Sequence, residues 1–315
     1  MRTVTLPSIA ISLCLCGCGP AANLDGAAVK DAWYGAAAAA RDRPETIEVG
    51  SWNIEWLGEP ERGPSDEELQ LDNVAHALAL LDLDVVGLVE VVSADAFAEL
   101  VARLPGYHGL LVTDEEVEGG RSAYGEGEQK VALLVRDRFT IERARVVLDD
   151  HAWDFAGRPP LEVSLAFTEQ GRPRTLDVVV VHLKAMADYD GYRRRVRAAD
   201  ALQRWLHDEH ARDWALVIGD FNDDLDASTY QGRTSPFDAL AHDECCRFTT
   251  EALSAADAST TIWHGATIDH HLATASLARR FVQDSAAVLR PDAWVDDYGE
   301  TTSDHYPVLT RYDLR

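Results

Sequence analysis

The chain has 315 residues, of which 46% are hydrophobic and 26% are charged, a composition typical of folded globular proteins. Its 29 basic and 54 acidic residues leave a formal net charge of −25. That charge excludes a general nucleic-acid coat protein, because such proteins gain affinity when Lys and Arg displace counterions from phosphates. It leaves open a nuclease that holds DNA only locally.

The first 18 residues have the organisation of a bacterial signal peptide with a lipobox. Arg2 precedes an apolar stretch from Val4 to Leu15, which is shorter than the roughly 20 residues that a membrane-spanning helix needs. The string Leu15-Cys16-Gly17-Cys18 resembles a lipobox, in which Cys18 would be lipidated. We predict an exported protein, either an outer-membrane lipoprotein held only by this anchor or, with an ordinary cleaved signal, a periplasmic or extracellular one.

The remaining chain divides into a tether and one domain. Residues 19–46 are rich in Ala and Gly and are predicted to be the tether, and residues 47–315 show no internal repeat or second linker. We expect a monomer. Three of the five cysteines lie in the leader, so only Cys245 and Cys246 remain in the domain. They form either a vicinal disulfide or a structural segment without a catalytic role, and no CxxC pattern is present.

In chain order, short apolar runs alternate with helical patterns. We predict strands over residues 47–53, 84–92, 130–136, 175–182, 214–219 and 267–273. We predict helices over residues 66–82, 93–104 and 192–207. The Gly- and acid-rich segment 113–128 indicates a mobile surface loop, and Gly171 and Pro173 indicate a hairpin at 169–174. Mixed strands and helices favour an α/β fold with two packed sheets and helices outside them.

Polar side chains cluster at the ends of these strands and in one segment near the C-terminus. The clusters are Asn53 and Glu55; Glu90; His182 and Lys184; Asp220 and Asn222; Asp269 and His270; and Asp304 and His305. One such cluster is ordinarily a turn or a helix cap, but six in one domain can converge on one rim. Carboxylate and amide oxygens suit Mg²⁺ or Mn²⁺. The pattern therefore indicates metal-assisted hydrolysis of phosphoesters.

The same motifs resemble one family. NIEWLG (53–58), the Glu90 strand, HLK (182–184), GDFN (219–222), IDH (268–270) and SDH (303–305) occur in the order of the endonuclease/exonuclease/phosphatase superfamily. Deoxyribonuclease I, exonuclease III-type enzymes, inositol-polyphosphate phosphatases and bacterial sphingomyelinases belong to it. The resemblance runs from about residue 47 to 312. It implies a four-layered α/β/β/α sandwich, the deoxyribonuclease I-like fold.

The resemblance also implies a role for each motif residue. The implied catalytic residues are His182, Asp220, Asn222, Asp269 and His305. Asp220 would activate or orient the attacking water, the two histidines would contact the phosphoryl oxygens, and Asp269 would orient His305. The implied metal ligands are Asn53, Glu90 and Asp304, holding Mg²⁺, with Mn²⁺ or Ca²⁺ as alternatives. Glu55 fits the site and a hairpin surface equally, and His270 and His271 are expected to pack or lie on the surface.

One departure from the family concerns the first catalytic histidine. Deoxyribonuclease I-like members pair that histidine with an acid on the strand that corresponds to residues 129–136. This chain has Gln129 and Lys130 there. We therefore expect His182 to be oriented differently.

The sequence leaves the substrate open between several classes. Arg193, Arg194 and Arg197 open a helix near the expected rim and are predicted to grip a phosphate backbone, or else to form a solvated face. The acidic 113–128 segment would repel a long polyanion. We predict a metal-dependent phosphodiesterase, foremost a nuclease acting on nucleic acid. The alternatives are a phosphomonoesterase, a sphingomyelinase-like phospholipid phosphodiesterase, or a catalytically silent binding module.

Overall fold

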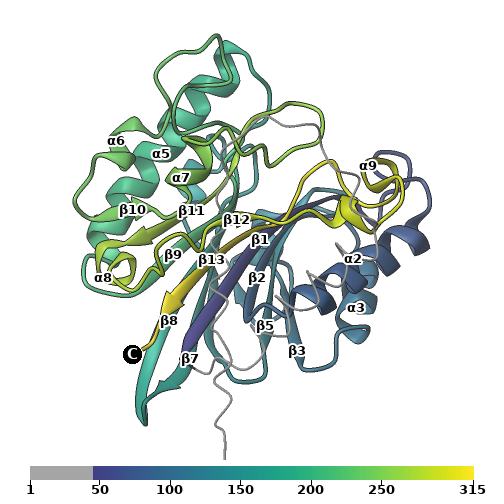
Figure 1. Ribbon diagram of the computed structural model, residues 1–315, viewed down its shortest axis with the longest axis horizontal. Helices are drawn as coiled ribbons and strands as arrows, with labels where there is room; N and C mark the ends of the chain where they lie inside the picture. Colours follow the sequence, from purple (N-terminus) through teal and green to yellow (C-terminus); the bar gives the residue numbers. More distant parts are fainter. Residues whose placement is uncertain (1–44) are drawn as a thin grey trace, which may run out of the picture.

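Two mixed β-sheets pack face to face in the computed structural model, which describes residues 45–315 (Figure 1). The first sheet has the strand order β12-β13-β1-β2-β5-β3. Its strands are β1 (Thr46–Leu57), β2 (Val85–Val91), β3 (Tyr107–Leu111), β5 (Lys130–Arg136), β12 (Ala287–Val288) and β13 (Val308–Asp313).

The second sheet has the order β10-β11-β9-β8-β7-β6-β4. Its strands are β4 (Val117–Glu118), β6 (Thr140–Val146), β7 (Leu161–Glu169), β8 (Arg172–His182), β9 (Ala215–Asp220), β10 (Cys246–Phe248) and β11 (Asp269–Thr274). The strands β8 and β9 are parallel neighbours, and their residues alternate between two packing layers. Val178 and Val180 of β8 pack between the sheets, while Val179 and Val181 face the opposite side. This two-residue period makes β8 apolar on both faces.

Helices cover the outer faces of both sheets. The longer helices are α2 (Glu67–Leu81), α3 (Ala94–Ala102) and α5 (Tyr189–Glu209). Single turns are α4 (Gly120–Ala123), α6 (Asp238–Ala241), α7 (Glu251–Ser254), α8 (Ala275–Ala278) and α9 (Tyr298–Thr301), with 3₁₀ turns at Asp149–His151 and Pro291–Ala293. Figure 1 shows α2 and α3 on one side of the molecule and α5 on the other. The predicted four-layered α/β/β/α sandwich is therefore confirmed.

The three longer helices begin at acceptor side chains. Asp66 caps α2 by accepting from the Leu69 amide, Ser93 caps α3, and Asp188 caps α5. Inward faces of α2 and α3 pack on the first sheet through Leu71, Leu78 and Leu100, among others. Leu202 of α5 packs on the second sheet. The apolar spacing that predicts these helices therefore also fixes which sheet each one covers.

The predicted elements agree with the structure to within a few residues, with one exception. The hairpin lies at Gln170 and Gly171, between Glu169 and its partner Arg172, and both turn residues have positive φ. The prediction of a surface loop over residues 113–128 is wrong in part. This segment contains β4 and α4, and Val117 and Tyr124 are buried in the core between the sheets. The few apolar side chains of this segment are separated by many acidic residues, so the sequence pattern does not reveal such short elements.

Within residues 45–315, no helix is both long enough and apolar enough to span a membrane. The predicted signal peptide, the lipobox Cys18 and the tether up to residue 44 lie outside the described residues.

Candidate active site

The predicted site residues meet where strands of both sheets end. His182 at the end of β8 lies beside Asp220 at the end of β9, and Asp269 at the start of the antiparallel β11 lies opposite Asp220. In the first sheet, Asn53 of β1 pairs with Val89, next to Glu90 of β2. Parallel neighbours bring their carboxyl ends to the same edge of a sheet. The two facing sheets therefore present one shared rim.

Asn53 links the two sheets directly. Its Nδ2 donates to Glu90 Oε1 at 3.0 Å and to Asp220 Oδ2 at 3.1 Å. Its backbone carbonyl accepts from Ser303 Oγ at 2.6 Å, which fixes the segment that carries Asp304. The side chain of Asn53 is buried, so these bonds are shielded from water. The side chain and the backbone carbonyl of Asn53 therefore link three of the other predicted motifs.

Three of the site residues have left-handed backbone conformations, among them Glu55 with φ 44°. Glu90 has φ 66° at a bulge in β2, and Asn222 has φ 56° just after β9. A non-glycine residue pays a steric cost in this region. Hydrogen bonds oppose that cost, because Glu90 Oε2 accepts from the Trp56 amide at 3.3 Å and Asn222 donates its amide to Asp220 Oδ1 at 2.8 Å. The strained backbone aims the side chains of Glu90 and Asn222 at the rim.

His305 is held by two carboxylates. Its Nδ1 lies 2.8 Å from Asp269 Oδ2, and its Nε2 lies 3.9 Å from Asp220 Oδ2. Burial opposes a charged imidazole, but Asp269 and then Asp220 raise the pKa of His305 well above its ordinary value. Burial and the nearby Asp269 raise the pKa of Asp220 to about 7. The two aspartates therefore favour the protonated form of His305, and burial favours the protonated form of Asp220.

His182 differs from His305 in its surroundings. Its Nε2 lies 3.6 Å from Asp220 Oδ2 and 3.7 Å from Glu90 Oε1. Its Nδ1 is buried and has no hydrogen-bond partner among residues 45–315. Burial, and secondarily the positive charge of Arg158, lower the pKa of His182 well below its ordinary value. Gln129, at the position of the missing acid, instead bonds to Arg158.

Arg158 is a site residue that no motif in the sequence predicts. Its Nη2 donates to the Leu183 carbonyl at 2.9 Å, and its Nε is buried without a partner among the described residues. Burial lowers the pKa of Arg158, while the charges of Glu90 and Asp220 oppose that change. A fixed guanidinium beside the predicted catalytic acids is suited to binding a phosphoryl oxygen. The only local hint in the sequence is that Arg158 stands between Gly157 and Pro159, in the segment just before β7.

Carboxyl groups crowd together at the predicted metal position. Glu55 Oε2 accepts from the Asp304 amide at 2.9 Å. Burial, followed by the charges of Asp304 and Glu90, raises the pKa of Glu55 to about 7. Burial also raises the pKa of Glu90. A divalent cation relieves repulsion of this kind, and oxygen donors suit Mg²⁺, Mn²⁺ or Ca²⁺. Glu55, Glu90 and Asp304 therefore offer oxygen donors suited to the predicted cation, while Asn53 Oδ1 accepts from the Glu55 amide at 3.0 Å. The assignment of Asn53, Glu90 and Asp304 as metal ligands stays a prediction.

The remaining motif residues hold the rim in shape. Asn222 donates from Nδ2 to the Leu183 carbonyl at 3.1 Å, which ties the GDFN turn to the HLK segment. Lys184 Nζ donates to the neighbouring Ala185 carbonyl at 3.1 Å. His270 and His271, expected to pack or to lie on the surface, are both fully buried and therefore pack in the interior.

The predicted arginine grip is largely engaged in contacts within the protein. Arg194 is buried and donates from Nε to the Trp153 carbonyl at 2.9 Å, and Arg197 Nε lies 2.6 Å from Asp154. Arg193 is exposed on α5. Two of the three side chains therefore hold the segment that leads to Arg158, and a direct phosphate contact by these arginines stays a prediction.

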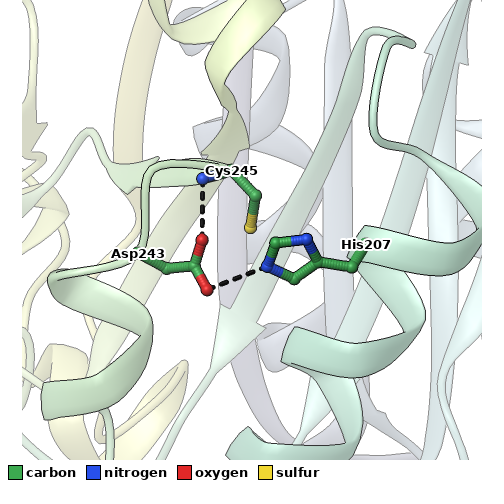
Figure 2. A group of neighbouring side chains, drawn as sticks. All are labelled: His207, Asp243 and Cys245. Atoms are coloured by element: carbon green, nitrogen blue, oxygen red, sulfur yellow. Dashed lines mark hydrogen bonds and ion pairs between the residues drawn. The ribbon is translucent and has the colours of Figure 1, made fainter.

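Cys245 and Cys246 are free cysteines whose sulfur atoms lie 3.2 Å apart. Figure 2 shows Cys245 beside Asp243 and His207. Asp243 accepts from the Cys245 amide at 2.8 Å, and its other oxygen lies 2.9 Å from His207 Nε2. This segment joins the chain before β10 to α5. The structural role predicted for the two cysteines fits these contacts.

The family model described as Endonuclease/Exonuclease/phosphatase family matches residues 50–305. No curated protein sequence matches the chain. Among solved structures, humanized D. rerio TDP2 with 14 mutations matches with TM-score 0.62 and 16% identity over 85% of this chain and 99% of that one. The human Nocturnin catalytic domain with bound sulfate matches with TM-score 0.57 and 20% identity over 85% and 94%. A Bacteroides thetaiotaomicron mannosyl-6-phosphatase matches with TM-score 0.54 and 18% identity over 84% and 98%. At these identities the solved structures show a shared fold.

Proposed function

Because the chain belongs to the Endonuclease/Exonuclease/phosphatase family, and is therefore an enzyme that hydrolyses phosphoester bonds, we propose that its substrates are phosphodiesters, with nucleic acids first among them. The observation that carries this proposal is the position of Asn53. It bridges Glu90 and Asp220 within a site that also holds two histidines and Arg158. Acidic residues, a charged imidazole and a guanidinium around one rim suit an anionic ester.

A divalent cation held by Glu90 and its neighbours would stabilise negative charge on the phosphoryl oxygens. Asp220 orients water and takes its proton, because its carboxyl group exchanges a proton near neutral pH. His305 donates a hydrogen bond from Nε2 to a phosphoryl oxygen while Asp269 holds the ring through Nδ1. Attack by water breaks the bond between phosphorus and the leaving oxygen, which takes up a proton from solvent. Arg158 and neutral His182 contact the remaining oxygens.

Exposed side chains that are close in sequence to the site segments bear on the size of the substrate. Trp153, Met186 and Trp263 are exposed, at 69%, 63% and 62% respectively. Trp153 precedes Arg158, Met186 follows the HLK motif, and Trp263 follows Thr261, which bridges to His305. Flat aromatic side chains stack on unpaired bases. These exposed aromatic side chains, together with the net charge of −25 on the whole chain, favour short or single-stranded nucleic acid over long duplex.

The same exposed side chains support a second candidate, a phospholipid phosphodiesterase. Trp is typical of surfaces that contact the membrane interface. Replacing Trp153 and Trp263 with Ala should then reduce hydrolysis of sphingomyelin vesicles and leave a small soluble phosphodiester unaffected.

The test is hydrolysis by the purified full chain in Mg²⁺, with supercoiled plasmid, a single-stranded oligonucleotide and sphingomyelin vesicles offered separately. Asp220→Asn should abolish hydrolysis, whereas Asp226→Asn, an exposed carboxylate six residues away, should not. EDTA should also abolish it. Hydrolysis of the sphingomyelin vesicles alone would favour the second candidate. Nucleic-acid cleavage that persists in Asp220→Asn would refute the assignment of Asp220 to the active site.

We also infer export and a lipid anchor at Cys18, with the domain acting as a monomer. The signal-like leader supports this inference. Metabolic labelling with a radioactive fatty acid should mark the chain, and Cys18→Ala should remove the label. An unlabelled wild-type chain would contradict the anchor.

A further inference from the structure

A second group of titratable side chains lies at the opposite end of the second sheet. Asp177 lies in the middle of β8, where its pairing with β9 begins, His210 caps the C-terminus of α5, and Asp213 lies in the turn before β9. Asp177 is paired with Ala215, five positions along β8 from the His182–Asp220 pair. At about 3.3 Å per residue, some 16 Å of strand separate the two groups. The catalytic rim therefore does not include them.

The imidazole of His210 is buried but incompletely bonded. His210 is 3% exposed, and neither Nδ1 nor Nε2 has a hydrogen-bond partner of good geometry within residues 45–315. Its Nδ1 is the nitrogen that faces the two aspartates. This nitrogen lies 3.5 Å from Asp177 Oδ2 and 3.9 Å from Asp213 Oδ2. One donor atom from each residue lies within 4.8 Å of the others. Burying a polar nitrogen without a hydrogen-bond partner is costly. We therefore expect a bound group between this nitrogen and the two carboxylates.

The spacing matches that of ligands around a small dication. Zinc lies about 2.0–2.1 Å from nitrogen and oxygen ligands, so two ligands in a tetrahedral site are about 3.3 Å apart. The observed 3.5 Å and 3.9 Å are slightly wider, and Asp213 is 61% exposed at its side chain and can adjust. The three donors can therefore close around one ion with small side-chain movements.

Neighbouring groups already orient two of the three donors. His210 Nε2 faces the buried Glu162 Oε1 at 3.0 Å, an arrangement that directs Nδ1 to a metal. Ser164 Oγ donates to Asp177 Oδ1 at 2.5 Å and leaves Oδ2 for the group. The supporting contacts come from β7, which lies beside β8.

We propose that Asp177, His210 and Asp213 bind a divalent transition-metal ion of the zinc class, separate from the catalytic cation. An imidazole nitrogen favours this class over Mg²⁺ or Ca²⁺. A surface pocket of about 360 Å³ is lined by Asp177 and Asp213, so water can complete the coordination. The ion joins the end of α5 to the middle of β8 and the turn before β9, and its role is structural.

The cluster of His207, Asp243 and Cys245 in Figure 2 is a competing zinc ligand set that the test must separate. Asp243 there already accepts from Gln203, from the Cys245 amide and from His207. His207→Ala removes that set and leaves Asp177, His210 and Asp213 intact.

The test titrates the metal-free full chain with Zn²⁺ by calorimetry and with Co²⁺ by visible absorption, all in a Glu90→Gln background that weakens the catalytic cation site. We expect one zinc equivalent and an intense tetrahedral Co²⁺ band. Asp213→Ala should weaken zinc binding at least tenfold and remove the band, while Asp208→Ala, an exposed carboxylate on the last turn of α5, and His207→Ala should change neither. Zinc binding as tight in Asp213→Ala as in the parent, or no binding by the parent, would overturn the proposal.

Discussion

His271 should make the fold sensitive to mild acid. It lies in β11 between the two sheets, with Nδ1 2.6 Å from Thr310 Oγ1 and Nε2 3.0 Å from Ser51 Oγ. Burial, and secondarily the charge of His270, lower the pKa of His271 to about 3. The unfolded chain protonates this histidine near its ordinary pKa of about 6.5. Proton binding by the unfolded state therefore favours unfolding below that pH.

The sign and size follow from linkage between protonation and folding. The folded pKa is lower than the unfolded one, so the contribution to stability is complete above about pH 6.5 and falls as pH drops toward the folded pKa of about 3. At pH 4.5 the protonated form of His271 outnumbers the neutral form about a hundredfold in the unfolded chain, whereas His271 stays neutral in the folded chain. Relative to pH 7, the free energy of unfolding should fall by roughly 2.5 kcal/mol through this residue alone.

The assay is urea unfolding followed by tryptophan fluorescence at pH 7 and pH 4.5. At pH 7 His271→Asn should be less stable than wild type, because it disturbs two buried hydrogen bonds. At pH 4.5 the difference between the two proteins should shrink by roughly 2.5 kcal/mol, since the variant has no histidine to protonate. His76→Gln, an exposed change on α2, should track wild type at both values. An unchanged difference between His271→Asn and wild type would refute the reasoning.

Three further outcomes test the site and its supports. Asp269→Asn should reduce kcat by about 10²–10⁴-fold with an unchanged melting temperature. The reason is that the variant lacks the negative charge that keeps a proton on His305. A near-normal kcat would contradict that role of Asp269. Arg158→Ala should reduce kcat/KM by about a hundredfold, whereas Arg193→Ala should change it less than threefold, as initial rates would show. Arg195→Met should destabilise the fold by about 3–5 kcal/mol in urea, because it leaves the carboxylate of Asp223 buried without its ion pair.

The pattern of the sequence predicts much of the fold because its strands are apolar on both faces. The predicted strand over 130–136 coincides with β5, and the predicted helix over 192–207 lies within α5. Polar residues that end such strands are conspicuous, and the structure brings His182, Asp220 and Asp269 side by side. Strand order and the facing of the sheets depend on distant pairings, which local patterns do not encode.

The arginines show which contacts such reasoning does not reveal. A run of arginines on a helix resembles a phosphate grip, but the partner of Arg197 is Asp154, 43 residues earlier in the chain. Arg158 stands alone between Gly157 and Pro159, and only the tertiary fold places it beside Glu90. Both cases depend on pairs of charges far apart in sequence, for which a single sequence gives no spacing rule.

The left-handed backbone at Glu90 and Asn222 has a consequence for engineering. Glycine relieves steric strain at positive φ, so stability-guided selection would favour glycine at both positions. Either change would remove a side chain from the catalytic rim. A campaign for a heat-resistant variant that screens only melting temperature would therefore accumulate inactive proteins, and these two positions should be held fixed from its first round.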